Sequence, residues 1–350
     1  MTLTADKEVN NRKIPLSGMT LDQLRKVVLD NGLPSFNAKQ IAAWLYKRRV
    51  SSIEEMTDLS KKAREALSLK YCIGRVAPNM WQKSADGTIK YVFAISGGYN
   101  IESVYIPDRE RATLCVSSQG GCRMNCRFCM TGHNGFHGQL GSHEIINQVL
   151  SIPESDTLTN IVFMGMGEPL DNYEAVRDSI EILTAEWGRA WSPKRITVST
   201  IGKTDGLKML LNDTKVHVAV SLHSPFGTER EQLMPVEKKY HIKDVIDLLK
   251  NYDFTGQRRC SFEYIMWKGL NDDEQHAREL ARLISPVKGC RVNLIRFHSF
   301  PEEPELKPCS QAVMENFRDY LNSKGIIATI RASRGEDILA ACGMLAGSKT

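Results

Sequence analysis

Cys122-Arg-Met-Asn-Cys126-Arg-Phe-Cys129 is a group of three cysteines at a C-x₃-C-x₂-C spacing. Thiolates are soft ligands that suit iron–sulfur clusters and zinc. Three of them can each bind one iron of a four-iron cluster, which leaves the fourth iron open to a substrate. A structural zinc would instead be closed by a fourth protein ligand nearby. The spacing therefore favours a [4Fe-4S] cluster with an open coordination site, with zinc as the alternative.

Length and composition are those of an ordinary globular chain. The 350 residues suggest about two domains, and 42% hydrophobic residues are enough for a sizeable core. The first residues, MTLTADKEVNNRKIPLSGM, lack the apolar core of a signal peptide, and no run approaches the roughly 18 apolar residues of a membrane span. We therefore expect a cytoplasmic protein without a membrane partner, whose nine cysteines serve metal or redox chemistry rather than a disulfide scaffold.

The net charge of +5 is unevenly distributed along the chain. Residues 1–100 contain 16 Lys and Arg against 9 Asp and Glu, whereas residues 101–350 contain 30 against 32. A basic amino-terminal third on a nearly neutral body indicates a surface for a polyanion such as nucleic acid. Basic helices are also often only solvated faces, so charge alone leaves both interpretations open.

The amino-terminal part divides into a helical and a strand-like segment. Short helices are expected over 20–70, beginning with a capping box at Thr20–Gln23. Farther on, a turn at Asp86-Gly87 lies among strand-like residues. We therefore predict a helical accessory domain over 1–72 and a β-meander connector over 73–108.

From about residue 109 the sequence alternates between strands and amphipathic helices, such as 242–249 and 273–284. This alternation indicates a parallel sheet, and right-handed crossovers let the sheet curl into a full or partial barrel. In such barrels the loops after the strands carry the chemistry. We predict an α/β barrel domain over 109–342 and a loose tail over 343–350. The expected strands are 112–116, 160–164, 195–200, 216–221, 261–266, 291–295 and 326–330.

The cysteine spacing resembles the signature of radical S-adenosylmethionine (SAM) enzymes, which bind the amino end of SAM with a Gly-Gly-Glu-like element after the second barrel strand. Met164-Gly-Met-Gly-Glu-Pro169 stands at that place, and Gly167 and Glu168 fit, because a carboxylate pairs with an ammonium group. Ser199 ends the third strand, and Ser221-Leu-His223 ends the fourth. Polar groups at successive strand ends could hold the ribose and carboxylate of SAM. Serines also commonly close strands or cap helices, so this interpretation stays open.

Two further cysteines lie far from the group of three. Cys115 lies in Arg111-Ala-Thr-Leu-Cys-Val-Ser-Ser-Gln119, and Cys342 in Arg334-Gly-Glu-Asp-Ile-Leu-Ala-Ala-Cys-Gly343. A lone cysteine is most often a small buried apolar residue. The glycine after Cys342 favours an exposed, bendable segment instead. We predict that four other cysteines are small buried apolar residues, namely Cys72, Cys260, Cys290 and Cys309.

Taken together, the motifs resemble the radical-SAM adenine carbon-2 methyltransferases from about residue 20 to the end. They are Cys115-Val-Ser-Ser-Gln, the three-cysteine group, Met-Gly-Met-Gly-Glu-Pro-Leu, Ser-Leu-His-Ser-Pro and Arg-Gly-Glu-Asp-Ile…Ala-Ala-Cys-Gly. That family modifies 23S ribosomal RNA and, in some members, tRNA. The resemblance implies a (β/α)₆-type partial radical-SAM barrel with an amino-terminal RNA-binding helical domain.

The resemblance also implies a role for each matching residue. Cys342 matches the methyl-carrying cysteine, Cys115 its partner in a transient disulfide, and Glu102 the residue assigned as proton acceptor. Many relatives have an asparagine that contacts SAM where this chain has His298, which can still donate or accept a hydrogen bond. The remaining matches are the cluster ligands Cys122, Cys126 and Cys129 and the SAM contacts Gly167, Glu168, Ser199, Ser221, Leu222 and His223.

The implied reaction explains why two kinds of cysteine are needed. Carbon 2 of adenine is electron-poor, so it cannot attack a methyl group itself. One SAM methylates Cys342, and a second SAM, cleaved at the reduced cluster, supplies a radical that removes a hydrogen from the S-methyl group. The resulting carbon radical adds to the ring, Glu102 takes the ring proton, and Cys115 attacks the sulfur of Cys342 to release methylated RNA. The implied partners are 23S rRNA, tRNA in some members, and an electron donor such as flavodoxin or ferredoxin.

Three other functions compete with this interpretation. A carbon-8 adenine methyltransferase, which confers antibiotic resistance, shares the cysteines, but Met-Gly-Met-Gly-Glu-Pro-Leu and Arg-Gly-Glu-Asp-Ile look more like the carbon-2 branch. A radical-SAM activase acting on a protein would need neither the Cys115 and Cys342 pair nor a basic helical domain. A zinc-stabilised RNA-binding module without activity would contain zinc but no iron or sulfide.

Overall fold

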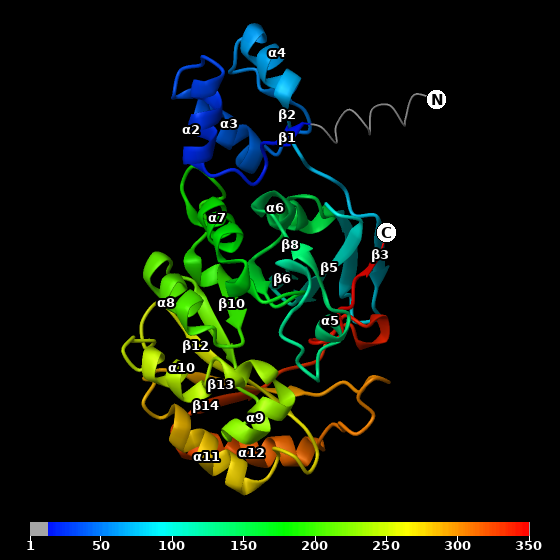
Figure 1. Ribbon diagram of the computed structural model, residues 1–350, viewed down its shortest axis with the longest axis vertical. Helices are drawn as coiled ribbons and strands as arrows, with labels where there is room; N and C mark the ends of the chain where they lie inside the picture. Colours follow the sequence, from blue (N-terminus) through cyan, green and yellow to red (C-terminus); the bar gives the residue numbers. More distant parts are fainter. Residues whose placement is uncertain (1–12, 350) are drawn as a thin grey trace. The chain divides into compact units, whose positions relative to one another are not determined.

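The computed structural model describes residues 13–349, and the chain divides into two compact units (Figure 1). The first unit comprises Met1–Pro78, Leu140–Asp156 and Glu174–Ser192, and the second comprises Asn79–Gln139, Thr157–Tyr173 and Pro193–Thr350. The first unit therefore takes in two segments from the middle of the chain, which no feature of the amino-terminal sequence indicates. The predicted boundaries of the helical, meander and barrel domains stay a prediction.

Short helices build the first unit, as the sequence predicted for residues 20–70. The capping box is present, since the Thr20 amide donates to Gln23 Oε1 at 2.8 Å and the Gln23 amide donates to Thr20 Oγ1 at 3.4 Å. At the end of the next helical segment the Arg48 guanidinium lies 3.9 Å from the centroid of the Trp44 ring. The elements are β1 (Ile14–Pro15), α2 (Leu21–Asp30), α3 (Asn37–Ala42) with its wider continuation Ala43–Arg48, α4 (Lys61–Lys70), β2 (Tyr71–Cys72), α6 (Ser142–Leu150) and most of α7 (Tyr173–Thr184).

The second unit is built on one mixed sheet, whose strand order is β14-β13-β12-β11-β10-β9-β6-β5-β4-β3. All neighbours from β14 to β6 pair in parallel, and the pairs from β6 to β3 are antiparallel. The parallel part is the predicted partial barrel, and the antiparallel part is the predicted meander. The strands are β3 (Met80–Lys83), β4 (Ile89–Ile95), β5 (Tyr99–Asp108), β6 (Arg111–Cys115), β9 (Asn160–Phe163), β10 (Ile196–Thr200), β11 (His217–Ser221), β12 (Cys260–Met266), β13 (Arg291–Arg296) and β14 (Ile327–Ile330).

The seven parallel strands agree with the expected ranges to within one residue at each end, because each is a short apolar run between clear helical patterns. The helices that follow β10 to β13 are α8 (Thr204–Asp213), α9 (Gly227–Leu233), α10 (Ile242–Leu249), α11 (Glu274–Ile284) and α12 (Gln311–Ser323). Each buries one apolar face, as Val245 and Leu249 of α10 do. In the part of the chain that the structure describes, no helix is long and apolar enough to cross a membrane.

The predicted loose tail is wrong for the described residues 343–349. The backbone of this segment is held by the Met130 amide, which donates to Gly343 O at 2.8 Å, and by the Thr131 hydroxyl, which donates to Leu345 O. Met344 and Leu345 are buried. The segment ends in β15 (Ser348–Lys349), which pairs antiparallel with β5. Long-range hydrogen bonds of this kind leave no periodic trace in a short sequence, so composition alone suggested a tail.

Candidate active site

The three cysteines lie in a loop after the first parallel strand, where the sequence placed them. The loop runs from β7 (Gln119–Gly121), which pairs with β8 (Phe136–Gln139), to the short helix α5 (Met130–His133). Gly121 has a φ of +77°, and a Cβ there would lie 1.9 Å from Gly135 O. The Cys122 amide donates to this same oxygen at 2.8 Å. A glycine is therefore required at 121 for the loop to close on itself.

The three thiols are neighbours in a largely dry environment. Cys122 and Cys126 are buried and Cys129 is half-buried. Burial raises the pKa of Cys122 to about 12 and that of Cys126 well above its usual value, and a negative charge on Cys129 raises both further. A bound metal cluster would replace the protons and hold the sulfurs as thiolates.

This donor set fits a [4Fe-4S] cluster, because three soft ligands on a tight loop can bind three corners of the cube. Among residues 13–349, no three His, Cys, Asp or Glu side chains gather as ligands of one ion. A four-iron cluster does not require such a gathering, since each of its corners takes a separate thiolate.

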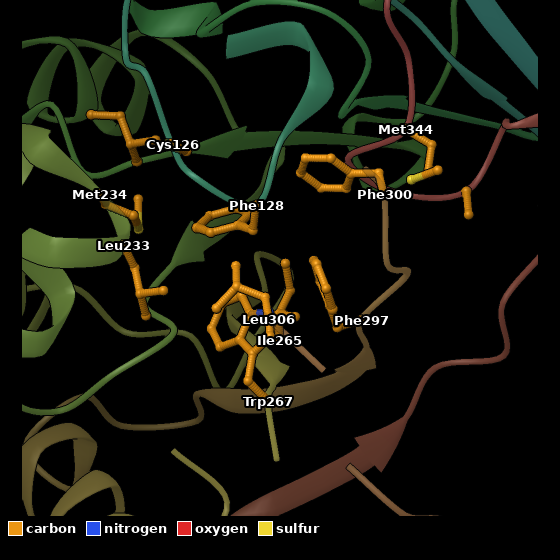
Figure 2. Packing of buried hydrophobic residues seen from close by; sticks show 12 residues of the cluster. Cys126, Phe128, Leu233, Met234, Ile265, Trp267, Phe297, Phe300, Leu306 and Met344 are labelled. Carbon is orange, nitrogen blue, oxygen red and sulfur yellow. The ribbon is translucent and has the colours of Figure 1, made fainter. Parts of the chain in front are cut away.

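Buried apolar side chains surround the cysteine loop (Figure 2). Phe128, between two of the cysteines, packs on Trp267 with ring centroids 5.4 Å apart. Met344 of the carboxyl-terminal segment belongs to the same cluster. Such a lining keeps water away from whatever the thiolates hold. The cluster comprises Cys126, Phe128, Ile201, Leu233, Met234, Ile265, Trp267, Phe297, Phe300, Leu306, Ala341 and Met344.

Arg230 of α9 is completely buried and ties the ends of two neighbouring strands together. Its guanidinium donates to Ile201 O at 2.7 Å, to Ser221 O at 3.0 Å and to Leu222 O at 3.2 Å, and it also pairs with the buried Glu237. These carbonyls follow or end β10 and β11. A residue that the sequence analysis did not consider therefore fixes the two strand ends that carry the predicted SAM contacts.

Glu168 occupies the predicted place after β9, but backbone groups already bind both of its oxygens. Oε1 accepts from the Leu170 amide at 3.0 Å, and Oε2 accepts from the Ile201 amide at 2.9 Å. Gly167 before it has a φ of +97°, and a Cβ there would lie 2.5 Å from the Gln119 side chain. In the chain alone, both residues hold strand-end loops together. Each carboxylate oxygen accepts more than one hydrogen bond, so an ammonium group could still bind.

Burial raises the pKa of Glu168 to about 7. A raised carboxyl pKa means that the folded state binds the extra proton, so this group stabilises the fold below pH 4.5 and the contribution is lost as the pH rises through 7. We expect the free energy of unfolding of the cluster-free chain to fall by up to about 3 kcal/mol between about pH 5 and about pH 8, relative to Glu168→Gln. Urea titrations across this range measure the difference, and the exposed Glu110→Gln variant should keep the wild-type slope. Parallel slopes for wild type and Glu168→Gln would contradict the assignment.

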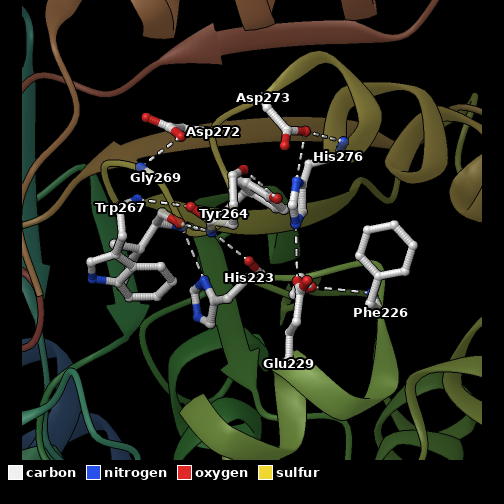
Figure 3. Close-up of polar contacts among 12 residues, drawn as sticks. His223, Phe226, Glu229, Tyr264, Trp267, Gly269, Asp272, Asp273 and His276 are labelled. Carbon is white, nitrogen blue, oxygen red and sulfur yellow. Dashed lines mark hydrogen bonds and ion pairs between the residues drawn. The ribbon is translucent and has the colours of Figure 1, made fainter.

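His223 follows β11 and is held in one orientation by the backbone of β12 (Figure 3). Its Nδ1 accepts from the Ile265 amide at 3.0 Å, and its carbonyl accepts from Asn271 Nδ2 at 2.7 Å. Burial lowers the pKa of His223 to about 3, so the ring is neutral and the proton lies on Nε2. The ring packs against Phe128 at 4.6 Å between centroids. Only Nε2 is left to donate to a ligand.

A row of polar side chains crosses four neighbouring strands of the sheet. Ser221 of β11 lies opposite Glu263 of β12, which lies opposite Asn293 of β13, which lies opposite Thr329 of β14. Asn293 Nδ2 donates to Glu263 Oε1 at 2.7 Å, and Thr329 Oγ1 donates to Asn293 Oδ1 at 3.0 Å. Ser199 is the second-last residue of β10 and is half-buried. Only Ser221 of this row was a predicted site residue.

Cys115 and Cys342 are brought together although 226 residues separate them. Burial raises the pKa of Cys115, and a negative charge on Cys342 raises it further, so the two residues lie within electrostatic range of each other. Glu263 and Cys129 raise the pKa of Cys342 in the same way, after burial. Cys342 is exposed. Cys342 thus lies near Cys115, the polar row and the cysteine loop.

Glu102 of β5 holds the segment that follows Cys342. Its Oε2 accepts from the Ala346 amide at 3.0 Å, and its Oε1 lies 3.4 Å from Lys90 Nζ. Both side chains are about nine-tenths buried. The Tyr99 hydroxyl donates to Ala346 O at 3.0 Å from the same strand. Sequence reasoning placed Glu102 at the site but did not foresee Lys90 as its partner.

His298 lies after β13 and contacts the loop that leads to Cys342. Its Nε2 is 3.0 Å from Ser333 Oγ, and its Nδ1 is 3.8 Å from Glu336 Oε2. Burial lowers its pKa. The structure therefore places His298 beside the cysteine-bearing loop, and both of its ring nitrogens already have protein neighbours. Of the four cysteines expected to be buried, Cys260 and Cys309 are, whereas Cys72 and Cys290 are half-buried.

Comparison with known protein families assigns both parts of the chain. Residues 116–281 match the radical SAM superfamily, and residues 14–73 match the ribosomal RNA large subunit methyltransferase N-terminal domain. The first match covers the three-cysteine loop and β9 to β12, and the second covers β1 to β2 with the helices between them.

Similar proteins match over nearly their whole length. The chain is 56% identical to the "Probable dual-specificity RNA methyltransferase RlmN" of Parabacteroides distasonis, over 96% of this chain and 98% of the relative. It is 39% identical to the "Dual-specificity RNA methyltransferase RlmN" of Syntrophus aciditrophicus, over 96% and 97%. A crystal structure of a radical SAM methyltransferase from Sphaerobacter thermophilus superposes with a TM-score of 0.87 at 38% identity, covering 95% of this chain and 99% of that one.

Proposed function

Because the chain belongs to the family of dual-specificity RNA methyltransferases within the radical SAM superfamily, we propose that it methylates carbon 2 of a specific adenosine in 23S rRNA. The relatives' names describe dual specificity toward RNA, which supports a second RNA substrate, and we include tRNA in that role. Methyl transfer is proposed to pass through an S-methylcysteine on Cys342.

The place of Cys342 beside the three-cysteine loop is the observation that carries this proposal, because the next residue, Gly343, accepts from the Met130 amide at 2.8 Å, directly after Cys129. Carbon 2 is electrophilic, so a methyl group must reach it as a carbon-centred species already attached to the protein. A thiolate is a good acceptor for the methyl group of SAM. An adduct through that sulfur can then be released by a second thiol that forms a disulfide. Cys342 and Cys115 are the two thiols that we propose for these two tasks.

The residues of the chain have separate tasks in the proposed reaction. Exposed Cys342 accepts a methyl group from SAM, while buried Cys115 stays protonated because burial raises its pKa. Cys122, Cys126 and Cys129 would hold the cluster, which with a second SAM would supply a radical able to remove a hydrogen from the S-methyl group. The resulting carbon radical would add to carbon 2, and as the adduct gives one electron back to the reduced-cluster couple, Glu102 would accept the proton that leaves the ring. Cys115 then forms a disulfide with Cys342 and frees the product.

The strand ends are proposed to orient SAM, two molecules of which are used per turnover. The buried Glu168 carboxylate would pair with the ammonium group of SAM, which would favour its ionised form despite burial. His223 would donate from Nε2. The proposed set comprises Gly167, Glu168, Ser199, Ser221, Leu222, His223 and His298, with Cys122, Cys126 and Cys129 on the cluster. A flavodoxin or ferredoxin is proposed as the electron donor.

Nucleoside mass spectrometry tests this function directly. RNA lacking the modification is incubated anaerobically with reconstituted protein, SAM and a reductant, then digested to nucleosides. We expect 2-methyladenosine at one position of 23S rRNA, and the same nucleoside in tRNA. The appearance of 8-methyladenosine would instead assign the carbon-8 chemistry. Unmodified RNA with protein that contains iron and sulfide would reject RNA as the substrate.

A further inference from the structure

Basic residues stand at the amino-terminal ends of five neighbouring parallel strands, β10 to β14. Parallel strands begin at one edge of a sheet, so these residues share the end of the barrel opposite the cysteine loop. Asp253 is the single acidic residue in the segments that join α8, α10, α11 and α12 to the next strand. The residues, here called the basic rim, are Lys194, Arg195, Lys215, Arg258, Arg259, Lys288, Arg291 and Lys324.

The cations of the basic rim lie close together and produce a concentrated positive potential. His217, the first residue of β11, has its pKa lowered to about 4 by burial and by the charges of Arg259, Lys194, Arg258 and Arg291. These four cations come from three different strand ends. Its Nδ1 accepts from the Arg259 amide at 2.9 Å, which keeps the ring neutral. The lowered pKa of His217 therefore indicates that these four rim cations lie close to one another.

The rim is also hollowed between the ends of α11 and α12. A cavity of about 660 Å³ lies there, lined by Lys288, Arg291 and Lys324 of the rim and by Arg278 and Arg282 of α11. The ring of Tyr320 lines the same hollow, 5.3 Å from Lys324 Nζ. Cations around an aromatic ring suit phosphate groups joined to nucleosides, because the ring offers a stacking face.

The partial negative charges at the carboxyl ends of the neighbouring helices do not neutralise the positive charge of the basic rim. The carboxyl ends of α8, α10, α11 and α12 lie at the strand beginnings, and each carries roughly half a negative charge. Together they offset about two of the eight rim cations. Arg278 and Arg282 are paired with Glu274 and Glu279 on their own helix. Six of the eight rim residues are exposed, so most of the charge faces outward; they are Lys194, Arg195, Lys215, Arg259, Lys288 and Lys324.

We propose that the basic rim binds the sugar–phosphate backbone of RNA, at a segment of the substrate distinct from the one whose adenosine enters the active site. The inference rests on the proposed RNA methyltransferase function. Strands of five to seven residues separate the two ends of the barrel by roughly 20 Å, a distance that a folded RNA spans easily. A short stem-loop at the cysteine end would not reach the rim, whereas a long rRNA would contact both ends.

Equilibrium binding of two RNAs by the holoenzyme tests the proposal without turnover. The probes are a short stem-loop carrying the target adenosine and a long 23S rRNA transcript that contains it. The variant Arg259→Gln with Lys324→Gln removes two rim charges from exposed side chains. The matched control, Lys208→Gln with Lys243→Gln, removes two exposed charges from α8 and α10.

We expect the rim variant to bind the long transcript about ten-fold more weakly and to reduce the slope of log affinity against log salt by about two, with the stem-loop unaffected. Long-transcript binding equal to that of the control would overturn the proposal, as would an equal loss for both RNAs. If the rim variant instead lost binding of inorganic phosphate with RNA binding unchanged, the rim would serve a small ligand and the proposal would fail. Failure of carbon-2 methylation is a separate result, read by nucleoside analysis.

Discussion

Replacing Cys342 by alanine should abolish methyl transfer to RNA while leaving the iron–sulfur cluster in place. The thiol is the proposed carrier of the methyl group, and an alanine offers no atom that SAM can methylate. Cys342 is not among the three cysteines of the loop between β7 and α5, so cluster assembly should not depend on it. We expect turnover to fall below detection, with unchanged iron and sulfide content and visible absorption. Turnover that persists would reject the carrier role.

Cys115→Ala provides the contrasting case, because it removes the resolving thiol and keeps the carrier. The expected product is a covalent complex of protein and RNA, visible as a shifted band on a denaturing gel. Cys290→Ala is a suitable control, since this half-buried thiol lies at the opposite end of the barrel, before β13. It should behave like the wild type in both assays. Absence of the trapped complex would count against resolution by Cys115.

Replacing Arg230 by methionine should cost about 3–5 kcal/mol of unfolding free energy, the largest stability effect that we expect in this chain. The change leaves Glu237 buried without its cation and removes the donors to Ile201 O and Ser221 O. A buried charge without a partner accounts for most of that cost. Urea unfolding of the cluster-free chain measures it. SAM binding should weaken as well, because the ends of β10 and β11 lose the guanidinium that hydrogen-bonds to both of them.

A double variant separates the ion pair from the fold. Adding Glu237→Leu to Arg230→Met removes the orphaned carboxylate, so we expect the double variant to be more stable than Arg230→Met alone. Arg278→Met on the exposed face of α11 removes a paired but solvated guanidinium and should cost less than about 1 kcal/mol. A double variant less stable than the single one would show that the carbonyl contacts of Arg230, and not its charge, hold the strand ends.

The sequence was sufficient for the elements and motifs whose information is local. The strands from β6 to β14 are apolar runs between amphipathic helices, and helix 242–249 was placed to the residue. The three cysteines are close in sequence, so their common loop followed from spacing alone. Gly167 and Glu168 were placed correctly after β9 for the same reason.

Contacts between distant segments could not be read in the same way. Arg230 lies in a polar stretch, Gly-Thr-Glu-Arg-Glu-Gln-Leu, that looks like a solvated helix, yet its guanidinium reaches the ends of two other strands. Glu263 and Asn293 face each other only because β12 and β13 pair in one register. The proximity of Cys115 and Cys342 came from resemblance, and no spacing in the chain expresses it. The hydrophobic periodicity of a sequence predicts which residues are buried, but it does not predict which buried polar groups contact one another.

The double attachment of Glu102 has a consequence for the order of events. While ionised, this carboxylate pairs with Lys90 and accepts the Ala346 amide, four residues after Cys342. If it takes the proton from the adenine ring, it loses the charge that binds Lys90 and becomes a weaker acceptor for Ala346. The segment that carries the methylated sulfur would then relax at the moment when Cys115 must attack it. The same proton transfer to Glu102 would therefore restore the aromatic ring of the base and loosen the segment from which the product must be released.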